Sequence, residues 1–115
     1  MSDCIFCKIA SGEIPAKKVY EDENLLAYYD IAPKSKGHTL VIPKKHAANL
    51  LEIGPEDLSI LIAGVKKVAG ILKAELNCDG FNILQNNGEA AGQSVHHIHF
   101  HIIPRYNGEK LEFAL

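Results

Sequence analysis

Three histidines, His97, His99 and His101, alternate with apolar residues near the end of the chain. Successive side chains of a β-strand point to opposite faces, so the histidines are predicted to share one face and the apolar residues between them the other. Neighbours on one face lie about 6.6 to 7 Å apart, so a single metal ion, with bonds of about 2 Å, cannot bind all three rings. The pattern indicates that at least one imidazole does nucleophilic or acid–base chemistry, which suits its unperturbed pKa near 6.5.

A glycine-rich segment, residues 88–94, lies directly before these histidines. Its small residues would let backbone amides approach an anion closely, and Ser94 adds a hydroxyl group at its end. This composition is typical of a phosphate-binding loop, and it also occurs in ordinary turns. Its position in front of the histidines favours a phosphate group held against an imidazole ring.

Cys4 and Cys7 form a C-x-x-C pair near the start of the chain. Such a pair supplies half of a tetrahedral zinc site, but it also fits two buried thiols or a redox pair. Cys78, the third cysteine, has no partner in this pattern. An odd number of cysteines argues against a disulfide framework and is consistent with a reducing compartment.

The composition excludes several classes of protein. A length of 115 residues fits one domain, predicted to span residues 1–115, and 47% hydrophobic with 23% charged residues is typical of a globular chain. A net charge of -2 gives no basic field for a nucleic-acid polymer. We find no apolar run of the roughly 20 residues that a membrane span needs, and no signal-peptide pattern. We therefore expect a cytoplasmic protein that binds neither a nucleic-acid polymer nor a membrane.

The elements that must position these residues form an α+β pattern. Alternating and β-branched segments predict strands of an antiparallel sheet over residues 19–21, 25–29, 38–43, 81–86 and 95–104. Apolar residues three and four apart predict one long helix from Pro55 to Leu76, after which Gly80 closes the turn. A short helix or turn is predicted over residues 4–10, and one or two helical turns over 46–51. Gly64 and Gly70, inside the long helix, predict a close neighbour on its second face, either a partner subunit or the same chain.

Several of these segments together resemble the histidine triad (HIT) family. Residues 97–103 (HIHFHII) match its signature of histidines alternating with apolar residues, and residues 92–95 (GQSV) precede it as in the Hint branch of the family. Residues 4–9 (CIFCKI) and 38–46 (HTLVIPKKH) are also similar. The resemblance implies a five-stranded antiparallel sheet with one long helix and a short N-terminal helix. It also implies a homodimer in which the two sheets join into a continuous ten-stranded sheet.

The resemblance further implies chemistry at a phosphorus atom. His99 would attack the α-phosphorus of a purine nucleoside 5'-phosphoramidate to give a covalent nucleotidyl-histidine, which water then hydrolyses. His101 would assist proton transfer to the leaving group, with Ser94 as a second donor. The implied nucleotide-binding residues are Asp30 at the ribose, Ile31, Phe6 and Ile9 around the base, and Asn86, Gly92, Gln93 and Ser94 at the phosphate, together with His99 and His101. The three apolar residues fit an ordinary core equally well, and His38 resembles a residue behind the site.

The family's zinc-containing bacterial-type members complete the cysteine pair with two histidines. The matching ligands here are Cys4, Cys7, His46 and His97. This Cys2His2 set leaves no coordination position open, so structural zinc is expected.

Other functions remain open at this point. They are a dinucleoside polyphosphate hydrolase, a zinc-stabilised nucleotide-binding or interaction protein with vestigial activity, and a hydrolase with catalytic zinc. Two departures from the family leave the leaving group open. The C-terminal segment Tyr106–Leu115 is short, and His96 occupies a position where many relatives have an aromatic residue.

Overall fold

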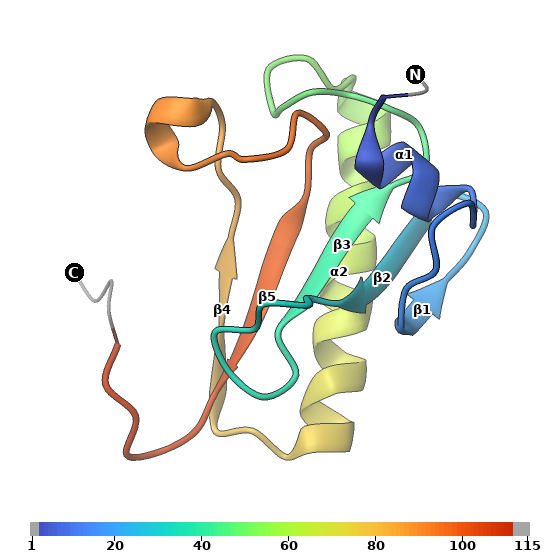
Figure 1. The fold of residues 1–115 in the computed structure, drawn as a ribbon. Helices are drawn as coiled ribbons and strands as arrows, with labels where there is room; N and C mark the ends of the chain where they lie inside the picture. The colour runs from blue at the N-terminus through green and yellow to red at the C-terminus, as the bar shows by residue number, and fades with distance from the viewer. Residues whose placement is uncertain (1–2, 112–115) are drawn as a thin grey trace.

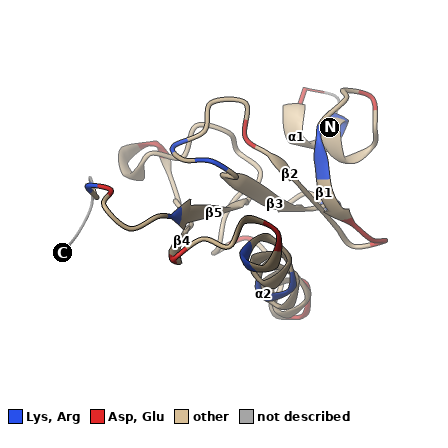
Figure 2. Cartoon of the chain, turned by 90° about the horizontal axis from the view of Figure 1, so that it is seen from below, with Lys and Arg blue, Asp and Glu red and all other residues tan. Residues whose placement is uncertain are grey.

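The computed structural model of the chain describes residues 3–111 and contains a five-stranded antiparallel sheet with a helix on each face (Figures 1 and 2). The strands are β1 (Lys18–Glu21), β2 (Leu25–Tyr29), β3 (Thr39–Pro43), β4 (Gly80–Leu84) and β5 (Phe100–Arg105), in the spatial order β1-β2-β3-β5-β4. The helices are α1 (Ile5–Ala10), α2 (Pro55–Leu76) and the short 3-10 helix η1 (Glu89–Ala91). The predicted fold class, with one long and one short α-helix, is confirmed. No helix of the described part is long and apolar enough to cross a membrane.

The sheet separates two apolar cores. The larger core lies against α2 and includes all three apolar residues of the histidine segment, Ile98, Phe100 and Ile102. The smaller core lies on the face that carries α1 and consists of Phe6, Leu26, Tyr28, Leu40 and Ile42. The rings of His97 and His99 contact Phe6, so these histidines lie on the α1 face. The predicted separation of the two faces is therefore present in the structure.

The ends of α2 follow from local sequence, with one correction. Gly54 is an extended N-cap and Pro55 is the first helical residue, where its missing N–H group costs nothing. At the other end Asn77 adopts the left-handed conformation, with φ of 51°, and its backbone N–H donates to the carbonyl of Lys73. The prediction that Gly80 closes the turn is wrong, because Asn77 ends the helix and residue 80 already begins β4.

Gly64 allows α2 to lie close to the sheet. A Cβ atom at this position would lie 2.1 Å from the side chain of Leu25 in β2. The close neighbour predicted for Gly64 is therefore a strand of the same chain. At Gly70 a Cβ atom would meet nothing within 4 Å in the described part of the chain, so this glycine lies on the open side of the helix.

β5 begins later than the predicted strand over residues 95–104. The pairing of β3 with β5 starts at Val41 and Phe100. Before that point the chain bonds to the loop that follows β3, where the N–H of Ile98 donates to the carbonyl of Ala47 at 2.7 Å. That loop contains bends and one short turn, and it forms no helix. The helical turns predicted over residues 46–51 are therefore wrong. As a result, the histidine segment enters the strand only at its last member, His101.

Candidate active site and metal site

His99 lies just before β5, and its ring is fixed in position. Its Nδ1 lies 2.8 Å from the carbonyl oxygen of His97, and its ring packs edge-on against Phe6 with 4.9 Å between the centroids. Because a carbonyl oxygen only accepts hydrogen bonds, the hydrogen of the neutral ring sits on Nδ1 and Nε2 keeps its lone pair. Burial lowers the pKa of His99, which favours the neutral ring. His99 therefore offers a nucleophilic nitrogen.

His38 and His101 form a chain of hydrogen bonds across β3 and β5. The backbone N–H of Lys34 donates to Nδ1 of His38 at 3.0 Å, so the hydrogen of the neutral His38 ring sits on Nε2. This Nε2 lies 3.0 Å from Nδ1 of His101 and 3.5 Å from a carboxylate oxygen of Asp30. Since His38 donates, His101 accepts on Nδ1 and carries its own hydrogen on Nε2. His101 therefore offers a hydrogen-bond donor.

The pKa shifts of His38 and His101 agree with neutral rings. Burial lowers the pKa of His38 despite the nearby Asp30 carboxylate. Burial, together with the neighbouring His99 and His38, lowers the pKa of His101 to about 4. Both rings are thus neutral at pH 7. The ring centroids of His99 and His101 lie 5.1 Å apart, and both rings line the same cavity.

A cavity of about 300 Å³ opens beside these rings. Five of the residues predicted for the site line it, namely Asn86, Gly92, Ser94, His99 and His101. Gly92 has φ of +95°, a conformation that side-chain-bearing residues rarely adopt, so a glycine is required where the loop turns toward the cavity. Lys34, His38, Leu84 and Ile103 complete the lining.

The other predicted nucleotide-binding residues lie outside that cavity. The Gln93 side chain is buried and bonds to the carbonyls of Ala48 and Val95, so it braces the loop from inside. Asp30 accepts from the N–H of Ala32 and lies beside His38. On the α1 face, Phe6 belongs to the smaller core and Ile9 packs against it. Ile31 is fully exposed.

Sequence analysis did not identify Lys34 as a site residue. Its only signal in the sequence is that it is a basic residue in the turn-rich segment four positions before His38. The sequence alone does not reveal why this spacing matters. In the structure, the connection between β2 and β3 brings the backbone N–H of Lys34 to the ring of His38.

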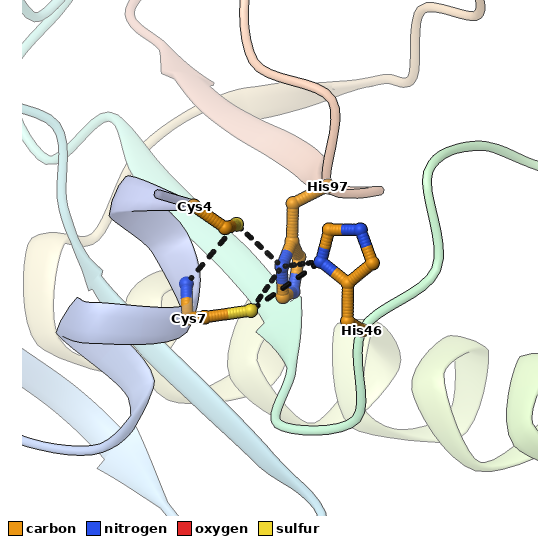
Figure 3. Close-up of side chains that lie close together, drawn as sticks. All are labelled: Cys4, Cys7, His46 and His97. Atoms are coloured by element: carbon orange, nitrogen blue, oxygen red, sulfur yellow. Dashed lines mark hydrogen bonds between the residues drawn. The ribbon is translucent and has the colours of Figure 1, made fainter. Parts of the chain in front are cut away.

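Four side chains, Cys4, Cys7, His46 and His97, converge beside α1 (Figure 3). Nδ1 of His97 lies 3.3 and 3.5 Å from the Sγ atoms of Cys4 and Cys7 and 3.2 Å from Nδ1 of His46. Zn–N and Zn–S bonds of about 2.0 and 2.3 Å place tetrahedral ligands roughly 3.3 to 3.8 Å apart. The observed separations are close to that range, so this group could hold a tetrahedral metal ion.

The hydrogen bonds around His97 fit metal binding as well. Its Nε2 lies 2.8 Å from the carbonyl oxygen of Pro43, so Nε2 carries the hydrogen and the lone pair of Nδ1 faces the other three side chains. Cys4 caps α1 and its Sγ accepts from the N–H of Cys7 in the first turn. The carbonyl of His97 is also the acceptor for His99. One residue therefore links the possible metal site to the candidate nucleophile.

A second group, Asp30, His38 and His101, also brings possible ligand atoms within 4.8 Å of one another. The tautomer of His38 argues against a metal here. Its Nδ1 accepts from Lys34, which leaves the hydrogen on the same Nε2 that would have to bind the ion. Hydrogen bonding alone accounts for this cluster.

These observations define an α+β protein with a histidine-lined cavity beside a Cys2His2 cluster, and comparisons with known proteins agree. A family model described as HIT domain matches residues 11–108. An uncharacterised HIT-like protein of Methanocaldococcus jannaschii is 59% identical over 92% of this chain and 81% of its own length. The adenosine 5'-monophosphoramidase of Schizosaccharomyces pombe is 51% identical over 92% of this chain and 77% of its length. The chain belongs to the HIT family.

A solved structure supports the same assignment. A zinc-bound histidine triad family protein from Mycobacterium smegmatis matches this fold with a TM-score of 0.91 and 47% sequence identity. The match covers 97% of this chain and 81% of the other.

Proposed function

We propose that the protein is a cytoplasmic hydrolase of purine nucleoside 5'-phosphoramidates that reacts at the α-phosphorus through a covalent nucleotidyl-His99. The observation that carries this proposal is the hydrogen bond from Nδ1 of His99 to the carbonyl of His97. It leaves the lone pair on Nε2 of a ring that lines a cavity of about 300 Å³, next to the N–H donor of His101. The relative in Schizosaccharomyces pombe, named for phosphoramidase activity, supports the substrate class.

The reaction has two balanced displacements. Nε2 of His99 attacks phosphorus, and the bond from phosphorus to the amine breaks. The amine leaves with the electron pair and a proton from the minor imidazolium form of His101, which thereby returns to its neutral form. Water then attacks phosphorus, returns a proton to His101, and breaks the bond to His99. The backbone amides around Gly92 and the side chains of Asn86 and Ser94 hold the phosphate oxygens as charge develops. Asp30 binds the ribose, and Phe6, Ile9 and Ile31 surround the base.

The Cys2His2 group holds zinc in this proposal, with Cys4, Cys7, His46 and His97 as ligands. Zinc would supply structural cross-linking between α1, the loop after β3 and the segment before β5. Within the same site, His97 positions His99 through its carbonyl oxygen. The zinc-bound relative from Mycobacterium smegmatis supports the choice of metal.

The proposal is tested by incubating purified protein with adenosine 5'-phosphoramidate and measuring AMP. We expect multiple turnovers and, in samples quenched in base, an adenylyl adduct that mass spectrometry maps to His99. An adduct on another residue would overturn the assignment of the nucleophile. Absence of turnover with retained nucleotide binding would favour the interaction protein with vestigial activity, and faster turnover of dinucleoside polyphosphates would favour that substrate class.

We also propose that a second copy of the chain pairs along β4, as the family resemblance implies. β4 is an edge strand, and Phe81 and Ile83 on it are 43% and 42% exposed. Together with Ile62, Val65 and Ala69 of α2 they line an apolar groove of about 520 Å³. An edge strand next to an apolar groove suits pairing with an identical edge, because both hydrogen-bonding groups and apolar area are then buried.

Replacing Ile83 with lysine is expected to convert a dimer into a monomer, because two copies would bring two buried ammonium groups together at the interface. Size-exclusion chromatography with light scattering measures the change. Leu51→Lys is the control, since Leu51 is 93% exposed and lies in the loop before α2. A wild type that is monomeric, or an Ile83→Lys variant that stays dimeric, contradicts this interface.

A further inference from the structure

The side chain of Gln93 is a buried hydrogen-bonding centre of the glycine-rich loop. Only 2% of this residue is exposed. Its Oε1 accepts from the backbone N–H of Gly88 at 2.8 Å, and its Nε2 donates to the carbonyls of Ala48 and Val95 at 2.6 and 3.0 Å. Both hydrogens of the amide are therefore used, and one side chain connects three stretches of backbone.

These contacts explain why a glutamine occupies position 93. The two carbonyl oxygens need two donors and the N–H of Gly88 needs an acceptor, a combination that the long carboxamide of glutamine supplies. A glutamate carboxylate would face two carbonyl oxygens without a hydrogen to donate. Methionine has a similar size but would leave these backbone groups without their bonds to the side chain.

The same contacts determine which way the neighbours of Gln93 face. Gly92 and Ser94 line the active-site cavity, whereas Gln93 is not part of that lining. The backbone N–H of Gln93 also donates to the carbonyl of Gly88 at 3.0 Å, so main chain and side chain together close the loop between these two residues. With Gln93 held inside the loop, Gly92 and Ser94 stay turned toward the cavity in which the phosphate is proposed to bind.

The contact with Ala48 aligns this loop with the candidate nucleophile. The N–H of Ile98, the residue before His99, donates to the carbonyl of Ala47 at 2.7 Å. The carbonyl of the next residue, Ala48, accepts from Gln93. Adjacent residues of one loop thus hold both the segment that carries His99 and the loop that faces the phosphate. A misplacement of about 1 Å between reacting groups can cost about a hundredfold in rate, so this alignment matters for displacement at phosphorus.

We propose that Gln93 is a positioning residue whose side chain aligns the phosphate-facing segment Gly92–Ser94 with the nucleophile His99. This inference rests on the proposed hydrolase function and concerns the same site. Gln93 acts through the backbone that its amide holds, and this amide touches no reacting atom. Loss of the amide should therefore weaken binding of the phosphate group while leaving binding of the nucleoside unchanged.

The experiment compares the affinities of AMP and adenosine, measured by titration calorimetry, in wild type, Gln93→Met and Val68→Ala. The two ligands differ only in the phosphate group, so the ratio of their affinities isolates the contribution of the loop. We expect Gln93→Met to lower this ratio about tenfold. An unchanged ratio in folded Gln93→Met, or a wild type that binds AMP no more tightly than adenosine, would overturn the role of Gln93.

Val68→Ala is the control for lost stability. Val68 is fully buried in the larger core, on the face of the sheet that carries α2. Its truncation leaves a cavity that lowers Tm, and it should keep the affinity ratio of wild type. A merely structural role of Gln93 predicts that both variants lower Tm and that neither changes the ratio. An equal fall of the ratio in Val68→Ala would contradict a specific role of Gln93.

Hydrogen exchange in wild type, measured by NMR, covers the case in which Gln93→Met does not fold. The N–H of Gly88 is bonded to Oε1 of Gln93, so its exchange rate reports how often this contact opens. If the contact favours binding of the phosphate group, binding must favour the contact to the same extent. We expect saturating AMP to slow this exchange at least about threefold more than saturating adenosine does. Equal protection by the two ligands would overturn the proposal.

Turnover separates this inference from the hydrolase function itself. In a protein that hydrolyses adenosine 5'-phosphoramidate, Gln93→Met should lower kcat/KM about a hundredfold. If wild type hydrolyses nothing but the affinity ratio falls in Gln93→Met, the proposed function fails and the positioning of the phosphate-facing segment stands. If wild type turns over but neither the ratio nor the exchange of Gly88 responds as expected, the role of Gln93 fails and the hydrolase function stands.

Discussion

Replacing His99 with alanine is expected to lower kcat/KM for adenosine 5'-phosphoramidate by at least about a thousandfold, equivalent to about 4 kcal/mol of transition-state stabilisation. The variant loses the nitrogen that bonds to phosphorus. His101 cannot replace it, because the nitrogen that it turns away from His38 carries a hydrogen. AMP release under steady-state conditions measures the loss, and circular dichroism shows whether the variant is folded.

The matched control for this experiment is His96→Ala. The side chain of His96 is 62% exposed and lies 3.5 Å from Glu89, and it is not part of the cavity lining. Its removal should change kcat/KM by no more than about threefold, because an exposed side chain outside the cavity lining contributes little to stability or binding. A folded His99→Ala protein with more than a tenth of wild-type activity would show that another group is the nucleophile.

The second large effect is expected from removal of the metal. Cys7→Ser, or a strong chelator acting on wild type, should lower Tm by roughly 10 °C or more, because losing 2 to 3 kcal/mol shifts a domain of this size by about that amount. In the proposed zinc site the four ligands would join α1 to the loop after β3 and to His97, so loss of the ion would remove this cross-link. Activity should fall in parallel, since the carbonyl of His97 fixes the tautomer of His99.

Metal content is the readout that distinguishes the alternatives. Cys78→Ala serves as the control, because Cys78 is buried outside the cluster and its variant should keep the metal of wild type. Full metal content in Cys7→Ser would contradict the ligand set. A chelated protein that keeps its Tm but loses turnover would instead point to a catalytic ion.

Much of the site follows from short-range pattern. The alternation over residues 97–102 predicted which side chains enter the core, and it holds even though β5 begins only at Phe100. The prediction is correct because burial of the apolar residues against α2 determines which face of the segment each side chain occupies. The relative position of Cys4 and Cys7 also follows from local structure, because Cys4 is the N-cap of α1 and Cys7 lies in the first turn of this helix.

Other features depend on contacts between distant parts of the chain. His38 and His101 are 63 positions apart, and they meet because β3 pairs with β5 and brings Leu40 opposite His101. Gln93 was predicted among the phosphate-binding residues, and only the folded loop shows that its side-chain amide donates to two backbone carbonyls. Ile31, predicted beside the base, is fully exposed.

By itself, the sequence determined the fold class, the faces of the histidine segment and the long helix, because each depends on residue types repeated at the period of a strand or a helix. The tertiary structure decided the tautomers of His99 and His101, the convergence of four possible metal ligands and the place of Lys34 at the cavity. Each of these requires a hydrogen-bond partner or a neighbour from another element, and such partners are fixed only when the strands pair and the loops close around them.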